Sequence, residues 1–102
     1  MAYKIIVDPT AGLDIIESIE WYNKAQPNLG IKFYKQVQAV FKTIRKNPSA
    51  FAIRYKINHT ATVKKFPFVV HYFIDDQKKT IVVTSVLHTS RNPKIWEERC
   101  EK

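Results

Sequence analysis

Residues 66–96 read FPFVVHYFIDDQKKTIVVTSVLHTSRNPKIW, and this stretch decides the fold. Two runs that are apolar on both faces flank a short polar segment, which predicts an antiparallel hairpin inside a sheet. The expected first strand, turn and second strand are residues 68–74, 75–79 and 80–88. The second strand leads directly into His88, Arg91 and Trp96. A basic, aromatic tail at the end of a buried strand is suited to bind an acidic partner.

The first half of the chain predicts a strand followed by a helix. Residues 3–7 form a short apolar run, and Asp8 and Pro9 then supply a capping oxygen and a first-turn proline. The helix should cover residues 9–24, because apolar side chains recur there at helical spacing. The expected buried face carries Ala11, Ile15, Ile19 and Tyr22, with Ile16 beside them.

A second helix should cover residues 28–46 and end at Asn47 and Pro48, since proline cannot continue a helix. Its expected buried stripe is Phe33, Val37, Val40, Phe41 and Ile44. Five cations lie mostly off that stripe: Lys32, Lys35, Lys42, Arg45 and Lys46. The short connection between the two amphipathic helices predicts an antiparallel helical hairpin.

After residue 51 the pattern changes from helices to strands. Two further strands are expected at residues 54–57 and 60–66, and Asn92 with Pro93 predicts a short terminal helix that carries Trp96. The predicted fold class is α+β, with the order β-α-α-β-β-β. Because helices and strands are segregated, we expect a small antiparallel sheet of about four strands with the helical hairpin on one face. A chain of 102 residues should form one domain, residues 1–102.

The charge of the chain indicates an acidic partner. Lys and Arg number 17 against 9 Asp and Glu, which gives a net charge of +8. A basic domain of this size favours nucleic acid, an acidic protein segment or an anionic membrane surface as partner, although a basic surface can also serve solubility alone. No apolar run reaches the roughly 20 residues of a membrane span, and the N-terminus does not resemble a signal peptide. Cys100 is the only cysteine, so the chain suits a reducing cytoplasm.

Metal and cofactor sites are not expected. His59, His71 and His88 are far apart in the sequence, and no zinc-ligand spacing includes them. Gly12 and Gly30 are the only glycines, which excludes a glycine-rich phosphate loop. No serine or cysteine lies in a nucleophile-elbow pattern.

A basic cluster remains as the candidate site. Its members come from the first strands after the helices and from the tail: Arg54, Lys56, Lys64, Lys65, His88 and Arg91. Such a cluster can bind a phosphodiester, and His88 is the best acid–base candidate because imidazole titrates near neutrality. The alternatives are that His88 is hydrogen-bonded to the following loop and that Lys64 and Lys65 are solvated strand residues. We interpret His71 as structural, and Trp21 and Tyr22 as helix packing.

Four groups of residues resemble patterns of the RelE/ParE superfamily of type II toxin–antitoxin systems, in particular its ParE-like branch. The first helix is similar to A-x-x-D-[LI]…[WY]Y through Ala11, Asp14, Ile15, Ile19 and Tyr22. Asn47 and Pro48 resemble the family's helix-ending proline. Phe66, Pro67, Phe68 and Tyr72 resemble F-P-[YF]-x-[IV]-x-Y, while Val86, His88, Arg91, Pro93 and Trp96 resemble V-x-H-x-x-R-x-P-x-x-W.

The resemblance implies a cytoplasmic, growth-inhibiting toxin of the kind found in plasmid stabilization systems, without a cofactor and neutralised by an acidic cognate antitoxin. ParE-like members are associated with inhibition of DNA gyrase, whereas RelE-like members cut mRNA on the ribosome, often with a tyrosine near the C-terminus. Trp96 stands near that tyrosine position, and indole has no titratable proton at useful pH, so it cannot replace a phenol as acid or base. The resemblance therefore favours a binding role for His88, Arg91 and Trp96. The alternative is an mRNA endonuclease that uses His88, Arg91, Arg54, Lys64 and Lys65.

Overall fold

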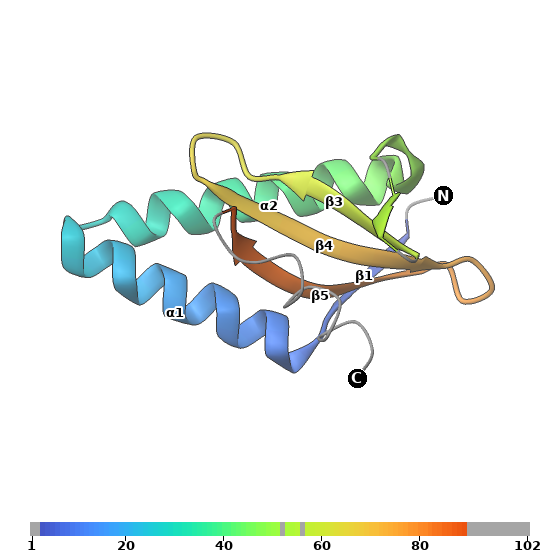
Figure 1. The fold of residues 1–102 in the computed structure, drawn as a ribbon, viewed down its shortest axis with the longest axis horizontal. Helices are drawn as coiled ribbons and strands as arrows, with labels where there is room; N and C mark the ends of the chain where they lie inside the picture. The colour runs from blue at the N-terminus through green and yellow to red at the C-terminus, as the bar shows by residue number, and fades with distance from the viewer. Residues whose placement is uncertain (1–2, 52, 56, 90–102) are drawn as a thin grey trace.

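The computed structural model describes residues 3–51, 53–55 and 57–89, and it confirms the predicted α+β fold (Figure 1). The elements follow in the order β1 (Lys4–Val7), α1 (Pro9–Ala25), α2 (Leu29–Lys46), the short 3₁₀ helix η1 (Pro48–Ala50), β2 (Ile53–Tyr55), β3 (Asn58–Thr62), β4 (Phe68–Asp75) and β5 (Thr80–His88). The expected terminal helix lies outside the described residues.

The sheet has five strands in the order β1-β5-β4-β3-β2. Strands β2 to β5 pair antiparallel, as predicted, but β1 pairs parallel with β5, so the sheet is mixed. The sequence did not predict this parallel pair, because no tight turn joins β1 to β5 and their relative direction is therefore not set locally. Residue Ile5 aligns with Ile81, and Val7 with Val83.

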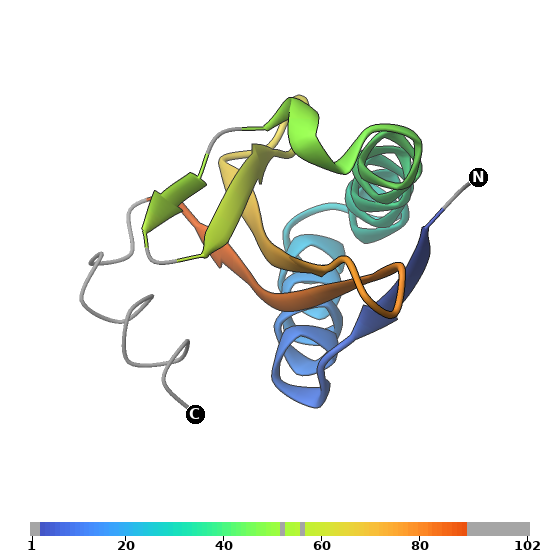
Figure 2. The ribbon, with the colours of Figure 1, turned by 90° about the vertical axis from the view of Figure 1, so that its right-hand side faces the viewer.

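Both helices pack on one face of the twisted sheet (Figure 2). The first helix begins as predicted: the Asp8 side chain accepts a hydrogen bond from the Thr10 backbone N–H at 2.9 Å, and Pro9 follows the cap. The second helix begins after Asn28, which adopts the left-handed conformation with φ of 69°. Gly30 then donates its backbone N–H to the Asn23 side chain at 2.8 Å, which joins the two helices at their connected ends.

The core lies between the helices and the sheet. Aromatic side chains from both helices and from the start of β4 form one cluster: the rings of Phe33 and Phe68 are 4.9 Å apart, and those of Tyr22 and Phe66 are 5.1 Å apart. The helical core positions Ala11, Ile15, Phe33, Val37 and Ile44 are buried, as the periodicity predicts. Ile16 was expected beside this face but is 53% exposed, because it lies on the outer side of α1.

A bulge between β4 and β5 decides which way the end of β5 faces. Tyr72 aligns with Val83, but its neighbour His71 aligns with Ser85, so one residue of β5 is skipped. Because of the extra residue, Val83 and Val86 both lie in the core although they are three positions apart. His88, two residues beyond Val86, consequently faces the helices.

Candidate functional site

A pocket of about 390 Å³ lies between α1 and the end of β5. Polar and apolar side chains line it together: Asp14, Glu17, Ser18, Trp21, Phe68, Val86, Leu87 and His88. The pocket forms where β1 ends, since β1 pairs with β5 only as far as Val83. Beyond that residue the outer edge of β5 is bordered by α1 instead of by a strand.

Asp14 fixes α1 against this edge of the sheet. Its carboxylate Oδ2 accepts a hydrogen bond from the Val86 backbone N–H at 3.1 Å. The next turn of α1 is held locally, because the Ser18 hydroxyl donates to the Asp14 carbonyl at 2.8 Å. The Asp14 carboxylate on the helix thus takes the place of a neighbouring strand as the acceptor for the Val86 N–H.

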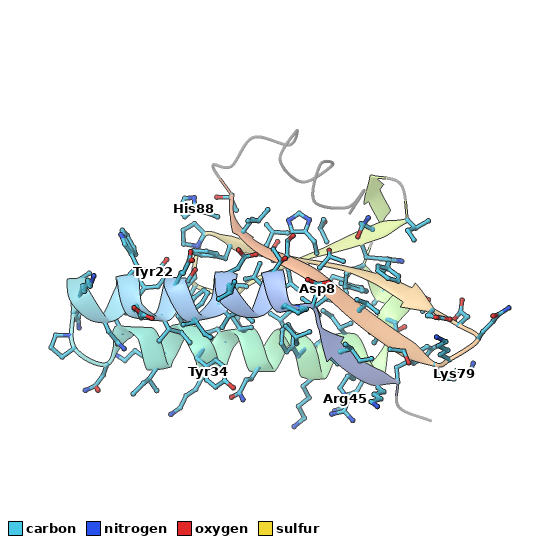
Figure 3. All side chains as sticks on the ribbon, turned by 90° about the horizontal axis from the view of Figure 1, so that it is seen from below. Asp8, Tyr22, Tyr34, Arg45, Lys79 and His88 are labelled. Carbon is cyan, nitrogen blue, oxygen red and sulfur yellow. The ribbon has the colours of Figure 1, made fainter. Side chains whose placement is uncertain are left out.

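His88 is placed by the end of the hairpin that the sequence predicted. It aligns with Phe68 across β4 and β5, and the two rings meet edge to face with centroids 5.3 Å apart. The following residue, Thr89, donates its backbone N–H to the Pro67 carbonyl at 2.8 Å. Figure 3 shows His88 and Lys79 at opposite ends of β5. The imidazole is half-buried in the pocket, where it can contact a bound partner.

Trp21 corrects one interpretation from the sequence. It was expected to pack within the helices, as Tyr22 does, but it is 65% exposed and lines the pocket. Its ring leans edge to face against the buried Tyr22, with centroids 5.0 Å apart. Together with Glu17 it gives the pocket an aromatic and acidic rim. Helical spacing could have separated the two residues, because adjacent positions lie about 100° apart around a helix and Tyr22 belongs to the buried stripe.

Arg54, the first basic residue of the predicted cluster, lies away from His88 in the sheet. Arg54 lies on the edge strand β2, which two strands separate from β5. The register places Arg54 about 14 Å across the strands and about 13 Å along them from His88. Lys56, Arg91 and Trp96 lie outside the described residues.

Lys64 and Lys65 are not strand residues, contrary to the expected strand at 60–66. Strand β3 ends at Thr62, and a turn closes with a hydrogen bond of 2.8 Å from the Val63 N–H to the Phe68 carbonyl. Lys65 has φ of 72°, which is incompatible with a strand. Lys64 lines a different, smaller pocket on the α2 side of the fold, together with Phe51 and Thr62.

Three residues of the central strands have structural roles: Tyr72, His59 and His71. Tyr72 is fully buried and donates its hydroxyl to the Pro48 carbonyl at 2.7 Å. Burial raises the pKa of Tyr72 to about 12, so the phenol stays protonated at neutral pH. His59 stacks on this ring at 5.0 Å and lies 2.6 Å from the Phe51 carbonyl through Nδ1. His71 is fully buried in β4, in agreement with the structural interpretation.

Within residues 3–51, 53–55 and 57–89, no group of three or more His, Cys, Asp or Glu side chains is arranged to hold a metal ion. Neither of the two described α-helices has the length and apolar character needed to cross a membrane.

The family model of the ParE toxin of type II toxin–antitoxin systems, parDE, matches residues 5–93. The chain belongs to this family. It is therefore the toxin of a type II toxin–antitoxin system, within the RelE/ParE superfamily, as the motifs predicted. A comparison with curated proteins finds no match.

Solved structures share the fold at low sequence identity. A chain of the chromosomal ParDE system from P. aeruginosa is 14% identical, with a TM-score of 0.76 over 87% of this chain and 98% of that one. A free-state mutant of the E. coli toxin RelE is 17% identical, with a TM-score of 0.66 over 99% and 97%. The RelBE2 toxin–antitoxin complex from Mycobacterium tuberculosis is 20% identical, with a TM-score of 0.62 over 86% and 99%.

Proposed function

We propose that this toxin arrests growth in the cytoplasm by binding and inhibiting DNA gyrase, and that an acidic cognate antitoxin neutralises it. The proposal is for a ParE-like inhibitor that acts by contact and carries no catalytic group. Support comes from the ParE toxin family model, which spans residues 5–93, and from complexes such as ParDE and RelBE2 in which relatives occur with antitoxins.

The buried hydroxyl of Tyr72 is the observation that favours a binding mechanism over catalysis. No tyrosine follows it in the sequence, and its own hydroxyl is buried against the Pro48 carbonyl. A phenol with a pKa of about 12 is a poor proton donor or acceptor at neutral pH. Since Arg54 also lies far from His88, the described residues assemble no set that combines an acid, a base and phosphate ligands.

The pocket between α1 and β5 is the proposed contact surface. Exposed Trp21 and half-buried His88 give it the aromatic character that recurs at the energetic centres of protein interfaces. Arg91 and Trp96 follow within eight residues of His88 and belong to the same proposed target-binding or antitoxin-binding surface.

Expression without antitoxin tests the proposal. We expect growth to stop with loss of negative supercoiling in a reporter plasmid, while bulk translation continues at first. Co-expression of the antitoxin from the adjacent reading frame should restore both. Arrest with cleaved mRNA, halted translation and normal supercoiling would reject gyrase as the target.

A ribosome-dependent mRNA endonuclease is the second candidate, because His88 is a titratable side chain in a pocket and the RelE fold is shared. In that case His88→Ala would abolish toxicity while His88→Gln, which retains a polar contact, would also be inactive. A binding role predicts that His88→Gln keeps most of the toxicity. Failure of the wild-type chain to arrest growth at high expression would instead indicate a non-toxic binding module.

A further inference from the structure

Charge is segregated between the two helices. Helix α2 carries five cations and no acidic residue in its 18 residues, a net charge of +5. Helix α1 carries three acids and one lysine in 17 residues, a net charge of −2. Solvated helices usually mix both signs, which stabilises them through pairs three or four residues apart. An unmixed helix such as α2 loses that stabilisation, and this indicates that its charge serves a partner.

Three lysines form a line on the outer side of α2. Lys35, Lys42 and Lys46 lie within about 40° of one another around the helix and span about 16 Å along its axis. All three are exposed, and they lie opposite the buried stripe that includes Phe33 and Ile44. Among the residues that the structure describes, none of the three has an ion-pair partner. We call Lys35, Lys42 and Lys46 the α2 lysine row.

Further cations flank the row. Lys32 is exposed on one flank of the row. On the same flank, Lys64 lines the small pocket of about 210 Å³ together with Ala39 and Thr43 of α2. On the other flank, Arg45 donates its Nε–H to the Tyr3 carbonyl at 3.2 Å, which ties α2 to the segment before β1. Figure 3 shows Tyr34 and Arg45 along the outer side of α2. The row thus belongs to a broader basic surface, in which Arg45 is anchored to the segment before β1.

We propose that the α2 lysine row binds the phosphate backbone of duplex DNA without sequence preference. Between residues 35 and 46, no large apolar side chain of α2 is exposed. An acidic peptide that orders on binding needs apolar anchors as well as charge. Such anchors lie on α1, where Leu13, Ile16 and Trp21 are all more than half exposed. On α2 the exposed Ile31 and Tyr34 precede the row in the first turns of the helix. Phosphates need only cations at regular spacing.

The same surface favours a duplex over a single strand. Proteins that bind single strands stack bases on aromatic side chains. The exposed aromatic of α2, Tyr34, lies about 80–120° around the helix from the three lysines, so it is not on the face that carries the row. Over the roughly 16 Å that the row spans, B-DNA presents about nine phosphates and one of its strands about five, so the duplex offers the denser row of charges. Duplex DNA is therefore the occupant that fits the row.

Binding to a short fluorescent duplex of arbitrary sequence tests the proposal. The full chain is used, and anisotropy measures its binding over a range of salt concentrations. Each phosphate contact contributes about 0.9 to the slope of log affinity against log salt. Lys35→Gln/Lys42→Gln/Lys46→Gln should reduce this slope by about 2 to 3. The matched control Lys4→Gln/Lys24→Gln/Lys78→Gln removes the same charge from exposed positions elsewhere and should reduce it by less than about 1.

Replacement of the row by arginine should retain wild-type binding, because arginine keeps the charge and the helix propensity. Thermal unfolding of each variant checks that it is folded. The proposal is overturned if the control triple weakens binding as much as the row triple, or if polyglutamate or single-stranded RNA binds more tightly than the duplex. The assay contains no gyrase, so its outcome is separate from that of the growth-arrest experiment.

Discussion

The carboxylate of Asp14 accepts a hydrogen bond from the backbone N–H of Val86, 3.1 Å away and 72 residues later in the chain. This contact joins the first family motif to the last one. It holds α1 along the part of β5 that β1 does not cover, and it forms the inner wall of the pocket that contains His88. The family's aspartate therefore has a structural role in shaping the candidate site.

Replacement of Asp14 by Ala should lower the free energy of unfolding by about 1.5–3 kcal/mol, because a hydrogen bond to a charged acceptor is lost at a partly buried position. Asp14→Asn should cost less, since its amide oxygen can still accept. Urea unfolding measures both. The control Glu20→Ala, exposed on the same helix, should change stability by no more than about 0.5 kcal/mol. Equal effects of Asp14→Ala and Glu20→Ala would contradict the assigned role.

The two glycines of the chain provide a matched pair of substitutions. A Cβ at Gly30 would overlap the Ile19 carbonyl oxygen and lie 2.7 Å from the Asn23 side chain, whereas a Cβ at Gly12 would meet nothing within 4 Å. Gly30→Ala should therefore destabilise the fold by about 1–3 kcal/mol through overpacking. Gly12→Ala should stabilise it by about 0.5–1 kcal/mol, because alanine favours helix. Thermal unfolding distinguishes the two, and a stabilising Gly30→Ala would show that the helices are not in close contact there.

The hydroxyl of Tyr72 should stabilise the fold through the Pro48 carbonyl. Tyr72→Phe leaves that carbonyl without its donor at a buried position, and we expect a loss of about 1–2 kcal/mol in the free energy of unfolding. Urea unfolding at neutral pH measures the loss. The exposed Tyr34→Phe is the control, and it should change stability by no more than about 0.5 kcal/mol.

Tyr72 should also give stability a dependence on alkaline pH. Burial raises its pKa from 10.0 to about 12, so the folded state retains the phenol proton more strongly than the unfolded state. The resulting contribution is fully present below pH 10 and is lost as the pH rises through 12. The stability difference between wild type and Tyr72→Phe should therefore be constant below pH 10 and shrink above it. A difference that stays constant up to pH 12 would show that the hydroxyl is not buried.

Trp21 should matter for binding and not for folding. Trp21→Ala removes a side chain that is 65% exposed, so the midpoint of thermal unfolding should barely change. If the pocket receives the antitoxin, affinity should fall about 30-fold or more, as for an interface residue worth about 2 kcal/mol. Isothermal titration with the antitoxin measures this. Ile57→Ala, exposed to a similar 61% at the connection of β2 and β3, should leave the affinity unchanged.

Much of the fold could be predicted because its local signals agree. The Asp8–Pro9 start, the end of α2 before Pro48 and the hairpin from Phe68 to His88 each depend on residues close in sequence, and the structure has all three. The family motifs also meet in space: Tyr72 bonds to Pro48, and Asp14 bonds to Val86. These long-range pairs link the first motif group to the fourth and the second to the third.

The site could be predicted only in part, since it depends on register. Strict alternation along β5 from Val83 would turn His88 away from the helices, and only the bulge beside Tyr72 turns it toward α1. No local sequence signal marks the skipped residue. The same dependence explains the basic cluster: the position of Lys64 follows from β3 ending at Thr62, four residues before the end at residue 66 that the apolar pattern indicated.

The most direct test of the central claim is an assay of purified DNA gyrase with relaxed plasmid and the purified toxin. The account predicts that the toxin inhibits supercoiling, that the antitoxin relieves the inhibition, and that His88→Gln retains most of it. Cell-free translation run in parallel should yield intact mRNA. Full supercoiling activity together with toxin-dependent mRNA cleavage on the ribosome would contradict the account and assign the toxin to the endonuclease class.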